Sequence, residues 1–282
     1  MTAVTTEPGR APSVPRDAHV TFLGELRAEW IKFTAVRSTP WILGVTVLVM
    51  IGIAALSAWS FSFLLDNPEE TGGAAAFPAD FDWAAQAAGA GYIMAQIVVA
   101  VLGVMVVTGE YTTGQIRSTL AAVPRRLPVL AAKGVVVTIA SFVTGLLGVA
   151  LGALVALPLL SSHDITLDLS RDGTLLSLLG APLYLVAVAL FSLGVGTMLR
   201  HTAGGIAVAV LIFFVLPMIW PNLAPDFFQD TSPYLPSIAG ARLMEGVDPD
   251  AVLSPWQGYG VMLAWAALAL LGGAVLLRRR DA

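Results

Sequence analysis

The polar segment 109–126 carries the side chains of this chain that are best placed for chemistry, and the chemistry that they would serve is recognition of a partner. It interrupts two long apolar runs and reads Gly-Glu-Tyr-Thr-Thr-Gly-Gln-Ile-Arg-Ser-Thr-Leu-Ala-Ala-Val-Pro-Arg-Arg. Ile116, Leu120 and Val123 recur at helical spacing and Pro124 is a stop signal, which predicts a short amphipathic helix. Such a helix fits a docking element, and it also fits an ordinary loop stiffened by a helical turn.

The sequence contains none of the motifs that carry nucleotide or metal chemistry. A P-loop ends in Gly-Lys-Ser/Thr, but the only two lysines, Lys32 and Lys133, are followed by phenylalanine and glycine. There is no His-Glu-x-x-His zinc motif, and His19, His163 and His201 are widely separated and lie outside the apolar segments. That placement also argues against an intramembrane serine protease. We therefore expect a chain that is not an enzyme and that holds no cofactor or metal ion of its own.

The apolar segments contain no Asp, Glu, Lys, Arg or His. Carriers coupled to protons or ions generally bind the ion through ionisable groups at depth, so this composition weakens that class, although sodium sites made of backbone carbonyls are compatible with it. Gln96 lies well inside the second apolar segment. It either makes an interhelical hydrogen bond worth about 1 kcal/mol or lines a substrate path. If the chain transports a substrate uphill, we expect the energy to enter from outside the bilayer, through the cytoplasmic loops.

The composition is that of a polytopic membrane protein. Hydrophobic residues make up 57% and charged residues 12% of the 282 residues, and the mean hydropathy is +0.81. A helix needs roughly 20 apolar residues to cross the hydrocarbon core. We expect an all-α polytopic membrane protein in which Pro158 and Pro217 kink or end the third and fifth spans. The six predicted spans are approximately 41–65, 84–108, 134–160, 174–199, 202–224 and 257–277.

The distribution of charge predicts the orientation of the chain. Thirteen of the 15 Lys and Arg residues fall before the first span, after the second, fourth or sixth span, and 13 of the 19 acidic residues fall in the other three loops. By the positive-inside rule, both termini and the loop 109–133 are cytoplasmic.

The N-terminal region is predicted to carry a helix that lies on the membrane surface. Residues 1–19 lack the apolar core of a signal peptide, so we expect a disordered cytoplasmic tail. Across 20–37, bulky apolar side chains share one face while Glu25, Glu29 and Lys32 share one flank. This pattern predicts an interfacial helix, with a helical extension of the first span, cut by Pro40, as the alternative.

Two further connections are informative. The segment 225–256 contains five prolines, and a connection of this length predicts a functional or re-entrant external region. The link between spans four and five is little more than Arg200-His201-Thr202, which requires these spans to be antiparallel neighbours.

Several short motifs are together similar to a known family. Residues 27–32 read Arg-Ala-Glu-Trp-Ile-Lys, and 37–39 read Arg-Ser-Thr just before the first span. A Glu-Tyr-x-x-Gly-x-Ile-Arg-x-Thr-Leu core begins at Glu110, and 235–240 read Leu-Pro-Ser-Ile-Ala-Gly. The sequence from about 20 to 280 resembles the permease subunit of ABC transporters of the ABC-2 class (type-2 exporter, type V), and the Glu110 core is fairly specific for bacterial members.

The resemblance implies a role for each cytoplasmic and external element. Residues 20–37 would be a connecting helix, 110–123 a coupling helix that docks into a separate ATP-binding subunit, and 225–256 a re-entrant region that closes the exit. The implied connecting-helix residues are Glu29, Trp30, Lys32 and Arg37. The implied coupling residues are Glu110, Thr113, Gly114, Ile116, Arg117, Thr119 and Leu120.

The resemblance also implies partners and a location. Two permease copies, identical or paralogous, would assemble with two ATP-binding subunits that hold ATP and Mg, among the lipids of a bacterial inner membrane and without nucleic acid. Substrate would pass between the permeases along spans two and five. The implied path residues are Met94, Gln96, Phe213 and Phe214, whose character leans towards lipids, amphipathic drugs or hydrophobic peptides.

Glu110 and Arg117 are seven residues apart and are predicted to share a helix face. We expect one of them to pair with a charge on the ATP-binding subunit or on the connecting helix; a screened surface pair is the alternative. Two other functions fit the sequence: a membrane scaffold or sensor subunit that transports nothing, and an ion-coupled secondary carrier.

Overall fold

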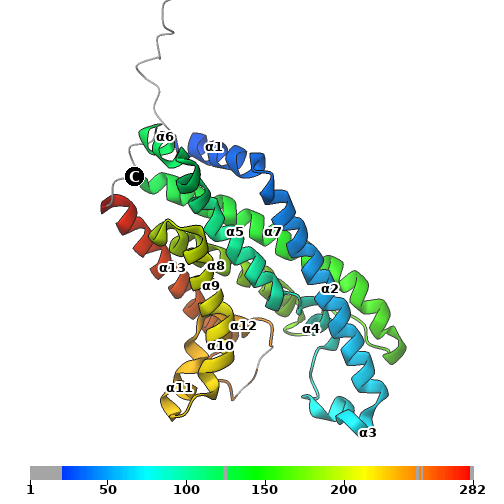
Figure 1. Ribbon diagram of the computed structural model, residues 1–282. Coiled ribbons are helices and arrows are strands. Elements are labelled where there is room, and N and C mark those ends of the chain that lie inside the picture. The colour runs from blue at the N-terminus through cyan, green and yellow to red at the C-terminus, as the bar shows by residue number, and fades with distance from the viewer. Residues whose placement is uncertain (1–20, 123–125, 246–247, 249, 280–282) are drawn as a thin grey trace, which may run out of the picture.

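The computed structural model describes residues 21–122, 126–245, 248 and 250–279, and over these residues the chain is a bundle of helices without strands (Figure 1). Six helical segments are long and apolar enough to cross a membrane, which confirms the predicted all-α polytopic fold class. The segments are Ser38–Asp66, Trp83–Thr113, Arg126–His163, Thr174–Leu199, Thr202–Asn222 and Pro255–Arg279.

Short helices supplement these six spans. The α-helices are α1 (Phe22–Ala35), α2 (Ser38–Asp66), α3 (Pro68–Thr71), α4 (Trp83–Gly89), α5 (Tyr92–Thr113), α6 (Gln115–Ala122), α7 (Arg126–Leu160), α8 (Thr174–Leu199), α9 (Thr202–Val210), α10 (Leu216–Ile219), α11 (Asp226–Thr231), α12 (Pro236–Ala241) and α13 (Pro255–Arg279). A π-helical turn covers Leu211–Val215, and 3₁₀ turns cover Gly73–Ala76, Ser161–His163, Trp220–Asn222 and Ser232–Tyr234. Span two is therefore α4 with α5, and span five is α9, the π turn and α10.

Helix α8 is the centre of the bundle. Within its spanning window 83% of the residues are buried, and it packs against α5, α7 and α13. Glycines permit the closest approaches. A Cβ added at Gly103 of α5 would lie 2.5 Å from the carbonyl oxygen of Ala189, and one at Gly194 of α8 would lie 2.4 Å from the carbonyl carbon of Ala269. Small residues at helix crossings are a usual means of close packing in membranes.

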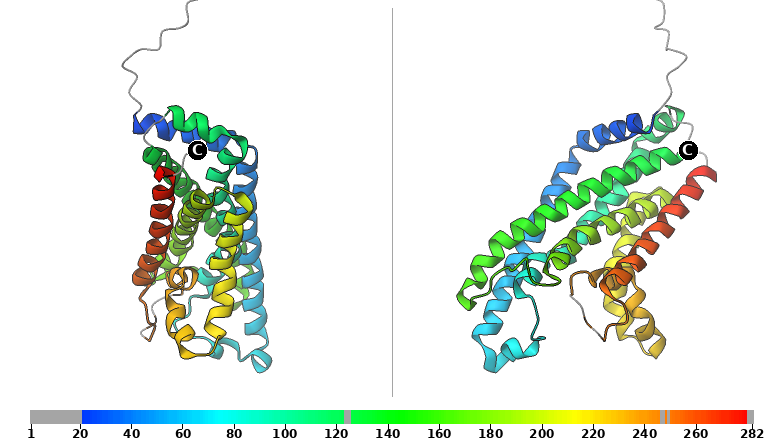
Figure 2. Two further views of the ribbon diagram at one scale, coloured as in Figure 1. Left: turned by 60° about the vertical axis from the view of Figure 1, so that its left-hand side comes forward. Right: turned by 180° about the vertical axis from the view of Figure 1, so that it is seen from behind.

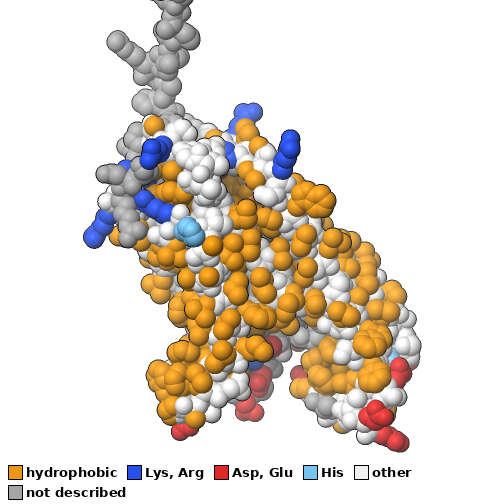
Figure 3. Space-filling model, viewed as in Figure 1, with side chains coloured by type: hydrophobic (Ala, Val, Ile, Leu, Met, Phe, Trp, Pro, Cys, Tyr) orange, Lys and Arg blue, Asp and Glu red, His pale blue; other side chains and the backbone are white. Residues whose placement is uncertain are grey.

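The two ends of the bundle differ in charge. Lys and Arg side chains gather at the end that carries α1, α6 and the end of α13, whereas Asp and Glu side chains gather at the opposite end, near α3 and α11 (Figure 3). We call these the basic end and the acidic end. Helices α1 and α6 lie across the basic end, at an angle to the long helices (Figure 2). The positive-inside rule assigns the basic end to the cytoplasm.

The helix predicted for 20–37 is shorter in the structure and is distinct from the first span. It begins after Thr21, whose side chain caps it by accepting a hydrogen bond from the backbone N–H of the third residue along. It ends at Ala35 because Val36 is extended, with φ −74° and ψ 116°. Val36 and Arg37 form an elbow between α1 and α2, and α2 continues through Pro40, so the alternative, an extension of the first span that is cut by Pro40, is wrong.

The third span begins earlier than predicted. Helix α7 starts at Arg126 and not near 134, and it runs through Pro158 to Leu160. The sequence places Lys133 in the loop before this span, but the structure buries it inside the helix. A buried lysine is tolerated only where its charge is paired, and the partners of Lys133 are described below.

Spans two and five are interrupted, each for a local reason. Between α4 and α5, Gly91 lies so close to α2 that a Cβ there would meet the backbone of Met50 at 2.4 Å. In span five, the N–H of Leu216 bonds to the carbonyl of Leu211, five residues back. The following residue, Pro217, has no N–H to continue the regular ladder, which favours the wider π turn.

The segment between spans five and six folds back towards the bundle. Helix α12 packs against α8 and α13, with Ser237, Ala239 and Gly240 buried. Within this segment, residues 246, 247 and 249 lie outside the described residues, as does the predicted tail 1–19.

Candidate functional site

Five side chains from four helices meet at the basic end. Glu29 and Lys32 come from α1, Glu110 from α5, Thr119 from α6 and Lys133 from α7. The formal charges of the two lysines and the two glutamates cancel. We call these five residues the charge cluster.

Lys133 is the most deeply buried member, with 3% of its surface exposed. Its Nζ lies 2.7 Å from Oε2 of Glu29 and 2.5 Å from Oε1 of Glu110. It donates a third hydrogen bond of 3.3 Å to the carbonyl of Val106. All three ammonium donors are thus used, which is the condition under which a buried charge is stable.

Lys32 connects α1 to both α5 and α6. Its Nζ lies 2.7 Å from Oε1 of Glu29 and 3.2 Å from Oε1 of Glu110, and it donates a 3.0 Å hydrogen bond to Oγ1 of Thr119. The Thr119 hydroxyl in turn donates to Oε2 of Glu110 at 3.2 Å. The Thr119 hydroxyl therefore joins α6 to one cation of the cluster, Lys32, and to one anion, Glu110.

The surroundings of Lys32 keep it charged. Its partial burial disfavours the ammonium form, but the hydrogen bond and charge of Glu29, and then those of Glu110, outweigh that effect and raise the pKa of Lys32 above its ordinary value of 10.5. The lysine is therefore positive at every physiological pH.

The predicted coupling helix 110–123 is two elements in the structure. Gly114 adopts a left-handed conformation, with φ 72°, which ends α5 at Thr113 and starts α6 in a new direction. The prediction that Glu110 and Arg117 share a face is therefore wrong. The expected pair between Glu110 and the connecting helix is present, through Lys32.

Helix α6 turns its apolar side inward. Ile116 is buried and Leu120 is half-buried, whereas Gln115, Arg117 and Ser118 are exposed. The outward surface of α6 is thus polar and cationic. Val123 and Pro124, predicted as the end of this helix, lie outside the described residues.

In the predicted connecting helix, charged side chains face the rest of the chain, and the tryptophan does not. Glu29 is buried and Lys32 is half-buried against α5, α6 and α7, while Trp30 and Arg37 are exposed. The charged flank of α1 therefore faces the bundle. Sequence reasoning missed Lys133 as a site residue, although its position at the edge of a long apolar run was a signal.

The four predicted path residues fall into two groups. Gln96 and Phe213 are buried within the chain: Oε1 of Gln96 accepts a 2.5 Å hydrogen bond from the Tyr184 hydroxyl, and the Phe213 ring lies 5.1 Å from that of Phe191. Gln96 thus makes the interhelical hydrogen bond that was one of its two predicted roles. Met94 and Phe214 are only half-buried.

Two more contacts link helix ends near the charge cluster. Nη1 of Arg126, at the start of α7, donates a 2.8 Å hydrogen bond to the carbonyl of Leu277 in α13. The Arg200 guanidinium lies 5.1 Å from the centre of the Tyr111 ring, which joins the ends of α8 and α5.

Within the described part of the chain, no group of three or more His, Asp or Glu residues is placed to hold a metal ion. No protein-family model matches the chain, and no curated protein matches it. Any functional assignment therefore depends on the geometry of the basic end and on the motifs in the sequence.

Proposed function

We propose that this chain is the membrane-spanning permease subunit of an ATP-driven exporter of the ABC-2 class in a bacterial inner membrane. In this proposal it acts with a second permease copy and with two separate subunits that bind ATP and Mg. The observation that carries the proposal is the charge cluster, which fixes the surface helix α6 to the ends of α1, α5 and α7.

A surface helix can move a membrane span only if the contacts between the helix and the span stay intact while the helix is displaced. Separating the partners of a buried ion pair costs about 3–5 kcal/mol, because each would be left as an unpaired buried charge. The cluster contains two such pairs at Lys133. These ion pairs hold the ends of α1, α5 and α7 together as one unit, and α6 is attached to that unit by the two hydrogen bonds of Thr119 and by its chain connection to α5. A displacement of α6 would then be passed to the three helix ends together, as expected for a coupling element.

The outward face of α6 is suited to a separate protein. Its apolar residue Ile116 is turned into the chain itself, whereas Arg117 and Ser118 remain exposed at the end of the molecule. The motor in this proposal is a separate subunit because the sequence has no P-loop of its own. Closure of two such motors on ATP would push both permeases, and substrate would pass between them, near the half-buried Met94 and Phe214.

Site-directed photocrosslinking in native membranes tests the proposal. A photoreactive amino acid in place of Ser118, on the exposed face of α6, should form an adduct with a protein that binds ATP. The same residue in place of Glu70, at the acidic end, and of the buried Ile116 serve as controls and should give no such adduct.

Each other outcome points to another function. An adduct at position 118 with a protein that binds no nucleotide would favour a scaffold or sensor subunit. Transport driven by a proton or sodium gradient without any ATP-binding partner would favour a secondary carrier. Either of these two results would overturn the proposal.

A further inference from the structure

A cavity of about 200 Å³ lies beside the charge cluster, between the elbow of α1 and α2, α5 and α7. The four charged residues of the cluster, Glu29, Lys32, Glu110 and Lys133, form one wall. The other walls are mainly apolar and include Phe33, Ile42, Leu102, Met105 and Val136. The cavity is thus amphipathic and lies at the basic end of the spans.

The charged wall has no cation to offer to a ligand inside the cavity. Both ammonium groups already donate three hydrogen bonds, Lys133 to Glu29, Glu110 and Val106, and Lys32 to Glu29, Glu110 and Thr119. An anion placed there would be desolvated without a partner. The part of a ligand that enters the cavity must therefore be apolar.

Gly109 keeps this cavity open. It lies inside α5, without the positive φ that requires glycine elsewhere, and a Cβ at this position would meet nothing within 4 Å. Packing explains Gly103, whose Cβ would meet Ala189, but packing does not explain Gly109. Glycine inside a helix costs about 0.5–1 kcal/mol relative to alanine. What this glycine provides is open space next to Glu110.

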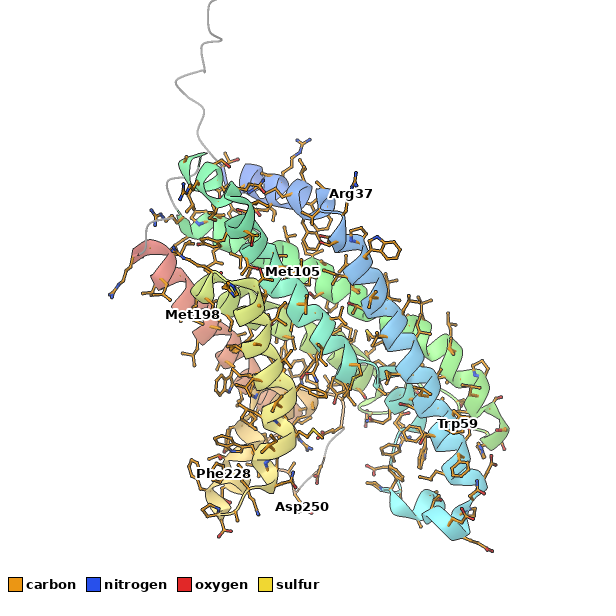
Figure 4. All side chains as sticks on the ribbon, viewed as in Figure 1. Arg37, Trp59, Met105, Met198, Phe228 and Asp250 are labelled. Carbon is orange, nitrogen blue, oxygen red and sulfur yellow. The ribbon has the colours of Figure 1, made fainter. Side chains whose placement is uncertain are left out.

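The surface around the cavity marks the membrane boundary. Trp30 and Trp41 flank the elbow and are 43% and 76% exposed, and tryptophans of this kind concentrate at the level of the lipid headgroups. Arg37 extends outward from the elbow, between the cavity-lining residues Val36 and Ser38 (Figure 4). Among the described residues none forms an ion pair with Arg37, so its guanidinium is available to an anionic group at this level.

We propose that this cavity binds the part of one acyl chain that lies nearest the headgroup of a phospholipid from the cytoplasmic leaflet, and that Arg37 binds the phosphate of the same molecule. The chain enters between α5 and the elbow and fills the space that Gly109 leaves. A soluble anion would find no free cation inside the cavity, because both lysines of the cluster already donate three hydrogen bonds. A purely apolar molecule would leave Arg37 without a partner. A phospholipid satisfies both the apolar walls and Arg37.

Occupancy of the cavity would also affect the contact between α1 and α5, because Lys32 and Glu110 form part of its wall. Lipid binding would then regulate coupling. That consequence rests on the proposed function, whereas the binding site itself does not.

Photolabelling in vesicles tests the site without reference to transport. The full chain is reconstituted in phosphatidylglycerol vesicles that contain a phosphatidylglycerol with a diazirine on one acyl chain, and adducts are mapped by mass spectrometry. We expect adducts on residues 102–109. Gly109→Leu, which fills the cavity, should reduce them at least about fivefold relative to adducts on the exposed face of α2.

The matched control is Gly44→Leu, which adds the same bulk on α2 at a position where a Cβ also meets nothing within 4 Å. It should leave labelling of 102–109 unchanged. Met105→Trp is a second cavity-filling variant, and the thermal unfolding of each variant shows that it is folded. Equal labelling of 102–109 in wild type and both cavity-filling variants would overturn the proposal.

A separate experiment tests the contact between Arg37 and the lipid phosphate. Arg37→Gln should reduce labelling of 102–109 by the phosphatidylglycerol probe several-fold and should leave labelling by a diazirine-bearing diacylglycerol, which has no phosphate, unchanged. Equal labelling of Arg37→Gln and wild type by the phosphatidylglycerol probe would overturn the role of Arg37.

Discussion

At the scale of single residues, Lys133 holds the basic end together. It neutralises two buried carboxylates, Glu29 and Glu110, that come from different helices. Without it, both would face each other with only the partly exposed Lys32 as a counter-charge.

Lys133→Met should therefore destabilise the chain by about 3–5 kcal/mol, the usual cost of leaving buried charges unpaired. Chemical unfolding in detergent measures this. The triple change Lys133→Met, Glu29→Gln, Glu110→Gln should recover a large part of the loss, since it removes the orphaned charges as well. A loss of under about 1 kcal/mol in Lys133→Met would mean that the cluster is hydrated.

Thr119 has a different role, because its hydroxyl ties α6 to the cluster. Thr119→Val keeps the shape and removes both hydrogen bonds. Lys32 is 26% exposed, so water can replace the lost partner and the stability loss should be only about 0.5–1.5 kcal/mol. We predict that ATP hydrolysis by the assembled complex nevertheless becomes independent of substrate, whereas Thr119→Ser behaves as wild type. Identical coupling in Val and Ser variants would remove Thr119 from the pathway.

The sequence predicted part of this site. The resemblance points to Glu110 and Thr119 as coupling-helix residues and to Glu29 and Lys32 as connecting-helix residues, but it does not indicate that the four form one cluster inside the chain. The pairing of Glu110 with the connecting helix was expected, but the contacts of Lys133 were not, because Lys133 is 104 residues from Glu29 and 23 from Glu110, and no local pattern encodes such a pairing.

At the scale of elements, Gly114 decides how α5 continues into α6. The spacing of apolar residues predicts one helix over 110–123, because that spacing does not reveal that a single residue adopts a left-handed conformation. The structure separates the two at φ 72°, and this corner places Thr119 back over Glu110.

Gly114→Val should therefore cost about 1–2 kcal/mol, because a β-branched residue is disfavoured in this conformation. Nothing lies within 4 Å of a Cβ at this position, so the cost comes from the backbone alone. Gly114→Asn is the control, since asparagine tolerates the left-handed region. We expect the unfolding free energy to fall for valine and to change little for asparagine; equal losses would mean that packing matters here.

Element boundaries in the spans were predicted well where hydropathy changes sharply, as for 174–199, which matches α8. They were predicted less well for α7, whose first residues include Lys133. A hydropathy pattern counts a lysine as the end of a span, whereas the fold retains it inside the helix through its two carboxylate partners.

At the scale of the whole molecule, six spans and opposite charge at the two ends follow directly from composition and the distribution of charge. What composition does not determine is how motion reaches the spans. The structure has a central helix, α8, that is buried on most of its surface, and a basic end where α1, α5, α6 and α7 are joined through the charge cluster. This arrangement suits a permease that an external motor pushes from the cytoplasm.

The most direct test of that claim is the rate of ATP hydrolysis, measured for the purified chain alone and for the chain co-purified with the protein that crosslinks at position 118. We predict no hydrolysis by the isolated chain, hydrolysis by the complex, and loss of the chain's stimulation of its companion in Arg117→Glu, with the same charge reversal at the exposed Arg279 of α13, Arg279→Glu, as the matched surface control. Transport by the isolated chain without a nucleotide-hydrolysing companion, or full stimulation by Arg117→Glu, would contradict the account.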